Sequence, residues 1–109
     1  MGELPYKQKM ASINQLTYVS DSNIHGKGLF ARLDIPKNTV IGAIQGKPWK
    51  RNGAHVIWLS ETQGFKVSCD LKYINHADKP NACYYDDLSV VALRNIKANE
   101  EITHNYESP

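Results

Sequence analysis

The chain has 109 residues, of which 41% are hydrophobic and 22% charged, and its formal net charge is +2. These values are typical of one folded domain with a single core. No apolar run approaches the ~20 residues of a membrane-spanning helix, the first ten residues lack the apolar stretch of a signal peptide, and the charge is too small to predict nucleic-acid binding. We therefore expect an intracellular protein with no membrane partner and no direct contact with nucleic acid.

Short runs of β-branched and aromatic residues predict strands along most of the chain. The runs lie at 16–19, 28–31, 39–44, 55–59, 65–68, 83–85, 89–93 and 101–106. Turn formers separate several of them, as at 35–38, 52–53 and 86–87. No apolar pattern of period 3.6 persists for ten residues, so any helix is short. The sequence predicts a mostly β protein, with an N-terminal arm or edge strand at 1–12 and one domain at 13–109.

Cysteine and histidine positions do not predict a metal site. Cys69 and Cys83 do not form a Cys-x-x-Cys pair, and the histidines, at 25, 55, 76 and 104, lack the short spacing of zinc ligands. Two buried thiols are favoured over a disulfide.

Charge is distributed unevenly between the two halves of the chain. Residues 1–52 hold eight Lys or Arg and three acids, whereas residues 53–109 hold five and eight. The acidic excess of the second half could attract a basic partner, but an ordinary solvated surface is the favoured explanation.

Three polar motifs stand in an informative order. The segments are SNIHGKGLFA at 22–31, YINHADKPN at 73–81 and NEEITHNY at 99–106. The first alone indicates only a tight turn entering a strand, and the last alone only a strand with alternating faces. Together, and in this order, they resemble the SET-domain protein lysine methyltransferases over roughly residues 16–106. The Asn-His-x-x-x-Pro-Asn segment is the most specific part of the resemblance.

The resemblance implies a fold and a cofactor. It implies several small sheets around a threaded C-terminal pseudoknot, which would bring Asn75 and His76 beside Tyr106. It also implies S-adenosylmethionine as the methyl donor, with a lysine amine of a protein as the acceptor. The residues that it implies for the cofactor are His25, Gly26, Lys27, Gly28, Leu29, Asn75, His76 and Tyr106. Those implied for the substrate lysine channel are Tyr84, His104 and Tyr106.

The resemblance assigns Tyr106 a position beside the transferred methyl group and the target nitrogen. An ordinary tyrosine is protonated at pH 7, so we expect orientation and electrostatics from it and not general-base catalysis. Tyr84 is a plausible channel wall or a residue packed on the sheet, and Tyr85 should face the opposite way on a regular strand. Pro80 and Asn81 are expected to hold the threaded loop.

Several positions depart from the family pattern. Ala77 and Asp78 replace Ser-Cys, Asn105 replaces an aspartate, and Ile44 stands where an aromatic residue is common. His104 replaces a Phe or Tyr, which favours mono- or dimethylation. Ile44, Asn105 and the expected lack of a C-terminal channel wall support an alternative function, a non-catalytic SET-like module that binds a peptide or protein partner.

The expected partners follow from the same resemblance. The substrate would be a histone, a histone-like protein or a component of translation. Family members with a C-terminal cysteine-rich segment close the channel with it, and none follows residue 106 in this sequence. A second subunit or the substrate itself is expected to complete the wall, and a homodimer is the preferred arrangement.

Overall fold

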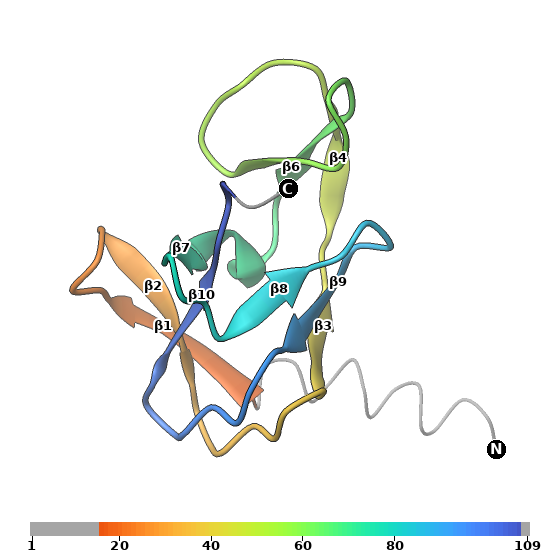
Figure 1. Cartoon of the computed structure of the whole chain (residues 1–109). Coiled ribbons are helices and arrows are strands. Elements are labelled where there is room, and N and C mark those ends of the chain that lie inside the picture. Colours follow the sequence, from red (N-terminus) through yellow and green to blue (C-terminus); the bar gives the residue numbers. More distant parts are fainter. Residues whose placement is uncertain (1–15, 108–109) are drawn as a thin grey trace, which may run out of the picture.

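The computed structural model describes residues 16–107, which form ten strands and one short 3-10 helix (Figure 1). The predicted N-terminal arm therefore lies outside the described residues. The elements are β1 (Thr17–Asp21), β2 (Lys27–Ala31), β3 (Val40–Ala43), β4 (Gly46–Trp49), β5 (Val56–Trp58), β6 (Gly64–Val67), η1 (Asp70–Tyr73), β7 (Asn75–His76), β8 (Ala82–Tyr84), β9 (Ser89–Ala92) and β10 (Glu101–His104).

The strands are arranged in three small sheets, which confirms the predicted mostly β class. The strand orders are β1-β2-β10-β7, β3-β9-β8 and β4-β6-β5. Every pair is antiparallel except β10 with β7, which run parallel. In Figure 1 the third sheet lies at the top right, away from the β1–β2 hairpin.

A tight polar turn joins β1 to β2. The Ser22 N–H donates to the Gly26 carbonyl (2.8 Å), and the Ser22 hydroxyl accepts from the Ile24 N–H (2.9 Å). Gly26 has φ +45°, a left-handed conformation in which a Cβ is unfavourable. The glycine at position 26 is thus explained by the conformation of the turn, which holds residues 25–27 at one rim of the site described below.

One apolar core joins the sheets. Its members come from most of the strands and from η1: Leu29, Ala31, Ile35, Ile41, Ile44, Ile57, Phe65, Val67, Leu71, Ile74, Ala82, Val90, Ala92, Ile96 and Ile102. Because these side chains alternate with exposed ones along strands such as β6, the short runs of the sequence suffice to bury one face of each sheet.

The position of β10 brings distant motifs together. It lies between β2 and β7, with Ile102 opposite Leu29 and Thr103 opposite Asn75. The strand ends at His104, two residues before the predicted end, because Asn105 Oδ1 accepts the Glu107 N–H (2.9 Å) and turns the chain. Tyr106 consequently lies beside His76, 30 positions earlier, with its N–H 3.2 Å from His76 Nδ1.

Two strands, β4 and β7, were not predicted. β4 contains Pro48, which has no N–H to donate, and such a strand is tolerated at the edge of a sheet, where β4 lies. β7 has only two residues and forms through its pairing with β10. Neither carries a local pattern of alternation that sequence reasoning could detect.

Candidate active site

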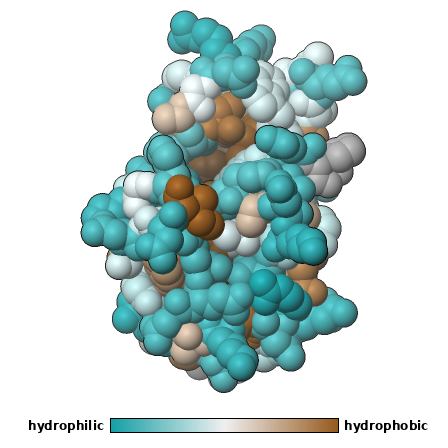
Figure 2. All heavy atoms as spheres, turned by 60° about the vertical axis from the view of Figure 1, so that its left-hand side comes forward, coloured by the Kyte–Doolittle hydropathy of each residue, from teal (hydrophilic) through white to brown (hydrophobic). Residues whose placement is uncertain are grey.

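A cavity of about 390 Å³ lies between the β1–β2 turn, η1 and β5. Its floor is apolar and its rim is polar; Figure 2 shows apolar atoms recessed between hydrophilic side chains on this side of the molecule. The lining residues are His25, Gly26, Lys27, Ala54, His55, Val56, Ile57, Val67, Lys72, Tyr73, Ile74, Asn75, His76, Tyr84 and Tyr106.

A second cavity of about 320 Å³ adjoins the first. It is lined by Val56, Ile57, Trp58, Leu59, Cys83, Tyr84, Tyr85, Asp86, His104 and Tyr106. Val56, Ile57, Tyr84 and Tyr106 line both cavities. Two ligands could therefore approach the same pair of tyrosines from different sides.

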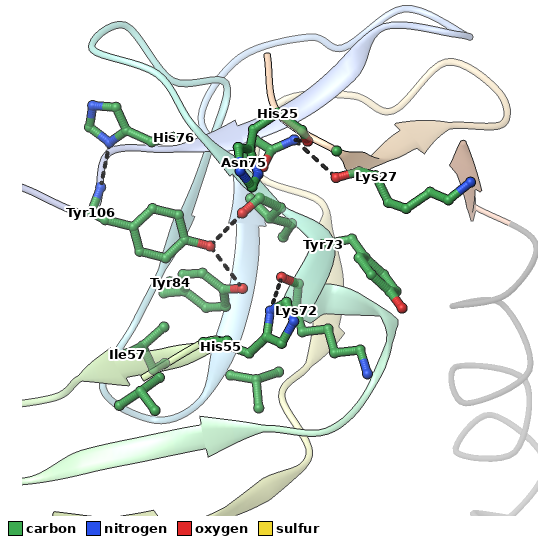
Figure 3. Close-up of a pocket in the computed structure, with 15 residues that line it drawn as sticks. His25, Lys27, His55, Ile57, Lys72, Tyr73, Asn75, His76, Tyr84 and Tyr106 are labelled. Carbon is green, nitrogen blue, oxygen red and sulfur yellow. Dashed lines mark hydrogen bonds between the residues drawn. The ribbon is translucent and has the colours of Figure 1, made fainter. Parts of the chain in front are cut away.

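The two phenols at this junction are held by backbone carbonyls. The Tyr106 hydroxyl donates to the Ile74 carbonyl (2.7 Å), and the Tyr84 hydroxyl donates to the Leu71 carbonyl (2.8 Å). The two hydroxyl oxygens are 3.4 Å apart, and Figure 3 shows the rings side by side below Asn75. Because each hydroxyl has one proton and already donates it, its lone pairs remain to accept from a ligand.

Partial burial of the phenols keeps both tyrosines protonated, although the Tyr106 residue as a whole is 40% exposed. This burial raises the pKa of Tyr106 to about 12, and it raises the pKa of Tyr84 still further, with the neighbouring Tyr106 contributing. Neither phenol is ionised near pH 7, so neither can serve as a general base there. The expectation that Tyr106 acts by orientation is consistent with this environment.

His104 completes an aromatic cluster with the two tyrosines. Its ring is perpendicular to both, with centroids 4.8 Å from Tyr84 and 4.7 Å from Tyr106. Burial lowers the pKa of His104, and its Nδ1 accepts the Tyr84 N–H (3.3 Å), which requires an unprotonated nitrogen. A neutral imidazole is thus favoured at this wall of the second cavity.

A hydrogen-bonded network fixes the amide of Asn75. Its Nδ2 is 3.0 Å from the His25 carbonyl, 3.1 Å from the Lys27 carbonyl and 2.9 Å from Glu101 Oε2. The Ser22 hydroxyl, 3.1 Å from Nδ2, lies 2.8 Å from both oxygens of Glu101. All of these neighbouring oxygens can accept a hydrogen bond, so the amide nitrogen of Asn75 must face them. Asn75 Oδ1 then remains available to accept a hydrogen bond from a ligand.

The glycine at position 28 is explained by this network. A Cβ there would clash with the Glu101 carboxylate and would lie 3.0 Å from Ser22 Cβ. Sequence reasoning had attributed this glycine to a closely approaching ligand. In the structure it makes room for a carboxylate of the protein itself.

The structure brings most of the predicted site residues together. His25, Gly26, Lys27, Asn75, His76 and Tyr106 line the first cavity, and Tyr84, His104 and Tyr106 line the second. Lys27 contributes its backbone, because its ammonium pairs with Asp21 (2.7 Å) and its side chain points away in Figure 3. Gly28 and Leu29 do not line either cavity, and Leu29 is fully buried in the core because it continues β2. The assignment of these residues to a cofactor stays a prediction.

The departures from the family pattern have specific places. Ile44 is buried in the core and does not line either cavity, and Asn105 forms the turn after β10. Asn81, only 1% exposed, accepts the Thr103 N–H (2.8 Å) and donates to the Glu101 carbonyl (2.8 Å). Asn81 therefore ties the residue before β8 to β10, in agreement with the structural role expected for it.

Sequence reasoning missed several residues of the site. Ile57 and Trp58 were predicted as strand residues without a function, and Tyr73, His55 and Glu101 were given no role. The apolar run at 55–59 signals a strand, but only the packing of β5 beside Tyr84 makes it a cavity wall. Glu101 lies 26 positions after Asn75 in the sequence, so the Asn-His motif gave no sign that the two side chains are hydrogen-bonded.

Neither a metal cluster nor a membrane-spanning helix is found among residues 16–107. No group of three or more His, Cys, Asp or Glu side chains in this range is placed to hold a metal ion, and Cys69 and Cys83 are free and partly buried. Within the same range, no helix has the length and apolarity needed to cross a membrane.

The described residues form a small β domain in which two cavities share the phenols of Tyr84 and Tyr106. Residues 26–107 match the SET domain, and the chain belongs to the SET-domain family. This confirms the resemblance seen in the sequence. The fold is similar to the crystal structure of a Plasmodium falciparum protein provisionally described as a histone methyltransferase, with TM-score 0.68 and 20% identity over 85% of this chain and 94% of that one. No curated protein matches the chain.

Proposed function

We propose that the protein is a protein lysine methyltransferase that uses S-adenosylmethionine. Membership of the SET-domain family supports the reaction class. The observation that carries the proposal is the meeting of the two cavities at Tyr84 and Tyr106, because methyl transfer requires donor and acceptor to reach one point from opposite sides.

The first cavity fits the cofactor in size and chemistry. Its volume of about 390 Å³ lies within the range of ~300–1,000 Å³ of small-molecule sites. Asn75 Oδ1 is an acceptor suited to the ammonium of an amino acid, and the backbone of residues 25–27 lies beside it. Val56, Ile57 and Ile74 supply apolar surface. The cofactor would bring an activated methyl group, so the protein has mainly to align the acceptor.

The second cavity provides the surroundings for a lysine amine. Free lysine has a pKa of ~10.4 and must lose its proton to attack. The rings of Tyr84, His104 and Tyr106 exclude water, which favours the neutral amine. The phenol oxygens, whose protons are donated to Leu71 and Ile74, accept from the amine and orient it. His104 limits the space for added methyl groups, in line with mono- or dimethylation.

The substrate would enter past an aromatic and acidic rim. Trp58 and Tyr85 are 42% and 44% exposed, and Asp86 lies beside them on the second cavity. A protein segment carrying the target lysine would cover these rings. A homodimer that completes the wall of this cavity is part of the same proposal.

Incubation with isotopically labelled S-adenosylmethionine and lysate from the source organism tests the function. The proposal would be supported if mass spectrometry finds labelled lysines with the wild-type protein and much less labelling with Tyr106→Phe. Calorimetric binding of S-adenosylhomocysteine by the folded protein without any label transfer would instead favour the non-catalytic binding module. Undiminished transfer by Tyr106→Phe would reject the role given to Tyr106.

A further inference from the structure

The outer face of the β4-β6-β5 sheet displays both tryptophans of the chain. Trp49 on β4 and Trp58 on β5 both pair with Gly64 on β6, so their side chains flank the glycine on one face. A Cβ at position 64 would lie 3.2 Å from the Trp58 ring, so the glycine lets the indole lie flat against the strand. The Trp58 residue is 42% exposed. The Trp58 indole N–H donates to Asn52 Oδ1 (2.6 Å), which holds the ring on this face.

Cations surround Trp49 on the same face. Lys47 and Lys66 are directly opposite one another in the register, and their ammonium nitrogens lie 5.0 Å and 4.4 Å from the centroid of the Trp49 ring. The Arg51 guanidinium is 5.9 Å from the same centroid. Like charges directly opposite across two strands destabilise a sheet. A bound anion would remove this repulsion.

The positive cluster continues into a cavity of about 490 Å³ towards η1. Lys47, Lys66, Lys72 and His55 line it, and the described lining residues include no Asp or Glu. Among residues 16–107, no carboxylate forms an ion pair with Arg51 or with these three lysines. Residues 46–72 hold five Lys or Arg and two acids. The field of this face is therefore not neutralised locally.

We propose that this face, defined by Lys47, Trp49, Arg51, Trp58 and Lys66, binds single-stranded nucleic acid. A strand presents one phosphate per nucleotide to the cations and flat bases to an exposed indole, and surfaces that bind single strands combine these two features. An acidic peptide would match the charge but would leave the exposed Trp58 ring without a stacking partner. The proposal does not require methyl transfer, but it shares Trp58 with the rim past which the methyl-acceptor segment would enter.

The net charge of +2 did not reveal this surface. Lys47 and Lys66 are far apart in sequence, and the pairing of β4 with β6 places them opposite one another. The acids of the second half that balance them, such as Asp86 and Asp87, lie outside the cavity. The total charge therefore says little about the local field.

Fluorescence anisotropy with a labelled oligo(dT) strand, measured at several salt concentrations, tests the proposal. Three phosphate contacts predict a slope of log K against log salt of about −2, from ~0.7 per contact. Lys47→Gln with Lys66→Gln should reduce the slope by about 1.4 and the affinity at least about tenfold, by the same rule. Trp58→Ala should lower affinity by about tenfold, because it removes stacking.

The matched control is Lys37→Gln with Lys97→Gln. These exposed lysines lie in the loops at the opposite end of the molecule, at the bottom of Figure 1. The control should leave slope and affinity unchanged. The proposal would be overturned by an equal loss of affinity in this control or by the absence of binding. It would also be overturned if polyglutamate competed as effectively as unlabelled strand, or if a duplex bound more tightly. Melting curves of each variant establish that a lost affinity is not a lost fold.

Discussion

The carboxylate of Glu101 offers the sharpest test of how the cofactor side of the site is built. Glu101→Gln keeps the shape of the side chain and replaces one acceptor oxygen by an NH₂ group. If that NH₂ takes the place of Oε2, it faces Asn75 Nδ2, which is itself a donor. If it takes the other place, the bond from Ser22 to Oε1 is lost, and Ser22 and Asn75 share the one remaining oxygen, which is no longer charged. Either orientation loses one of the bonds to Glu101.

The magnitude follows from the bonds that are lost. Glu101 accepts from Ser22 at 2.8 Å and from Asn75 at 2.9 Å, and hydrogen bonds to a charged group contribute ~1.5–3 kcal/mol each. With one of them lost, we expect the free energy of unfolding to fall by about 1.5–3 kcal/mol. For a domain of about 100 residues, each kcal/mol lowers the Tm by about 4–8 °C.

Urea denaturation measures the stability, and calorimetry with S-adenosylhomocysteine measures the effect on Asn75. A loosened Asn75 amide should weaken binding, and every ~1.4 kcal/mol corresponds to a tenfold loss of affinity. The control is Glu61→Gln, an exposed residue of the loop between β5 and β6. The network would be refuted if Glu101→Gln had unchanged affinity and a stability within about 0.5 kcal/mol of wild type, which is the range of an ordinary surface substitution.

Three other substitutions test the sheet and the aromatic cluster. Gly46→Ala would drive a Cβ into the Lys66 carbonyl, so chemical denaturation should show a loss of at least ~2 kcal/mol, whereas Gly53→Ala, with only an ordinary contact, should be nearly neutral. Burial lowers the pKa of His104 below 6.5. The contribution of the neutral imidazole to stability is therefore complete above pH 6.5 and is lost as the pH falls through the pKa of the folded state. In His104→Phe, the melting temperature should depend less on pH in that window. Lys47→Glu, opposite Lys66, should raise the free energy of unfolding by ~0.2–1 kcal/mol, and a decrease would show that the lysine pair is not strained.

The parts of the fold that the sequence predicted are those with a local cause. Short apolar runs located β2, β6 and β9, because one face of each packs on the core. The turn at 35–38 was visible because Pro36 and Asn38 suit it, and Asn38 has φ 72°. β4 and β7 escaped notice because their partners, and not their own residues, determine that they are strands.

The site was predictable only where a motif carried it. The Asn-His pair and Tyr106 were found by resemblance, and the structure places them within one cavity. Glu101 and Ile57 could not be found in the same way, because their roles arise from packing between segments far apart in the chain. For Gly28 the structure adds a reason that the motif did not indicate: a carboxylate of the same chain lies where a Cβ would be.

The alignment of the two phenols depends on η1, an element that carries no catalytic side chain. Leu71, in η1, and Ile74, which follows it, bury their side chains in the core, at 2% and 3% exposure, while their carbonyls accept from Tyr84 and Tyr106. The same two residues therefore anchor the segment and fix the hydroxyls. Because the carbonyls move with the backbone, a smaller side chain at position 71, which lines neither cavity, would displace the Tyr84 hydroxyl without removing any group from the cavities. The packing of this segment in the core therefore determines where the two hydroxyls lie.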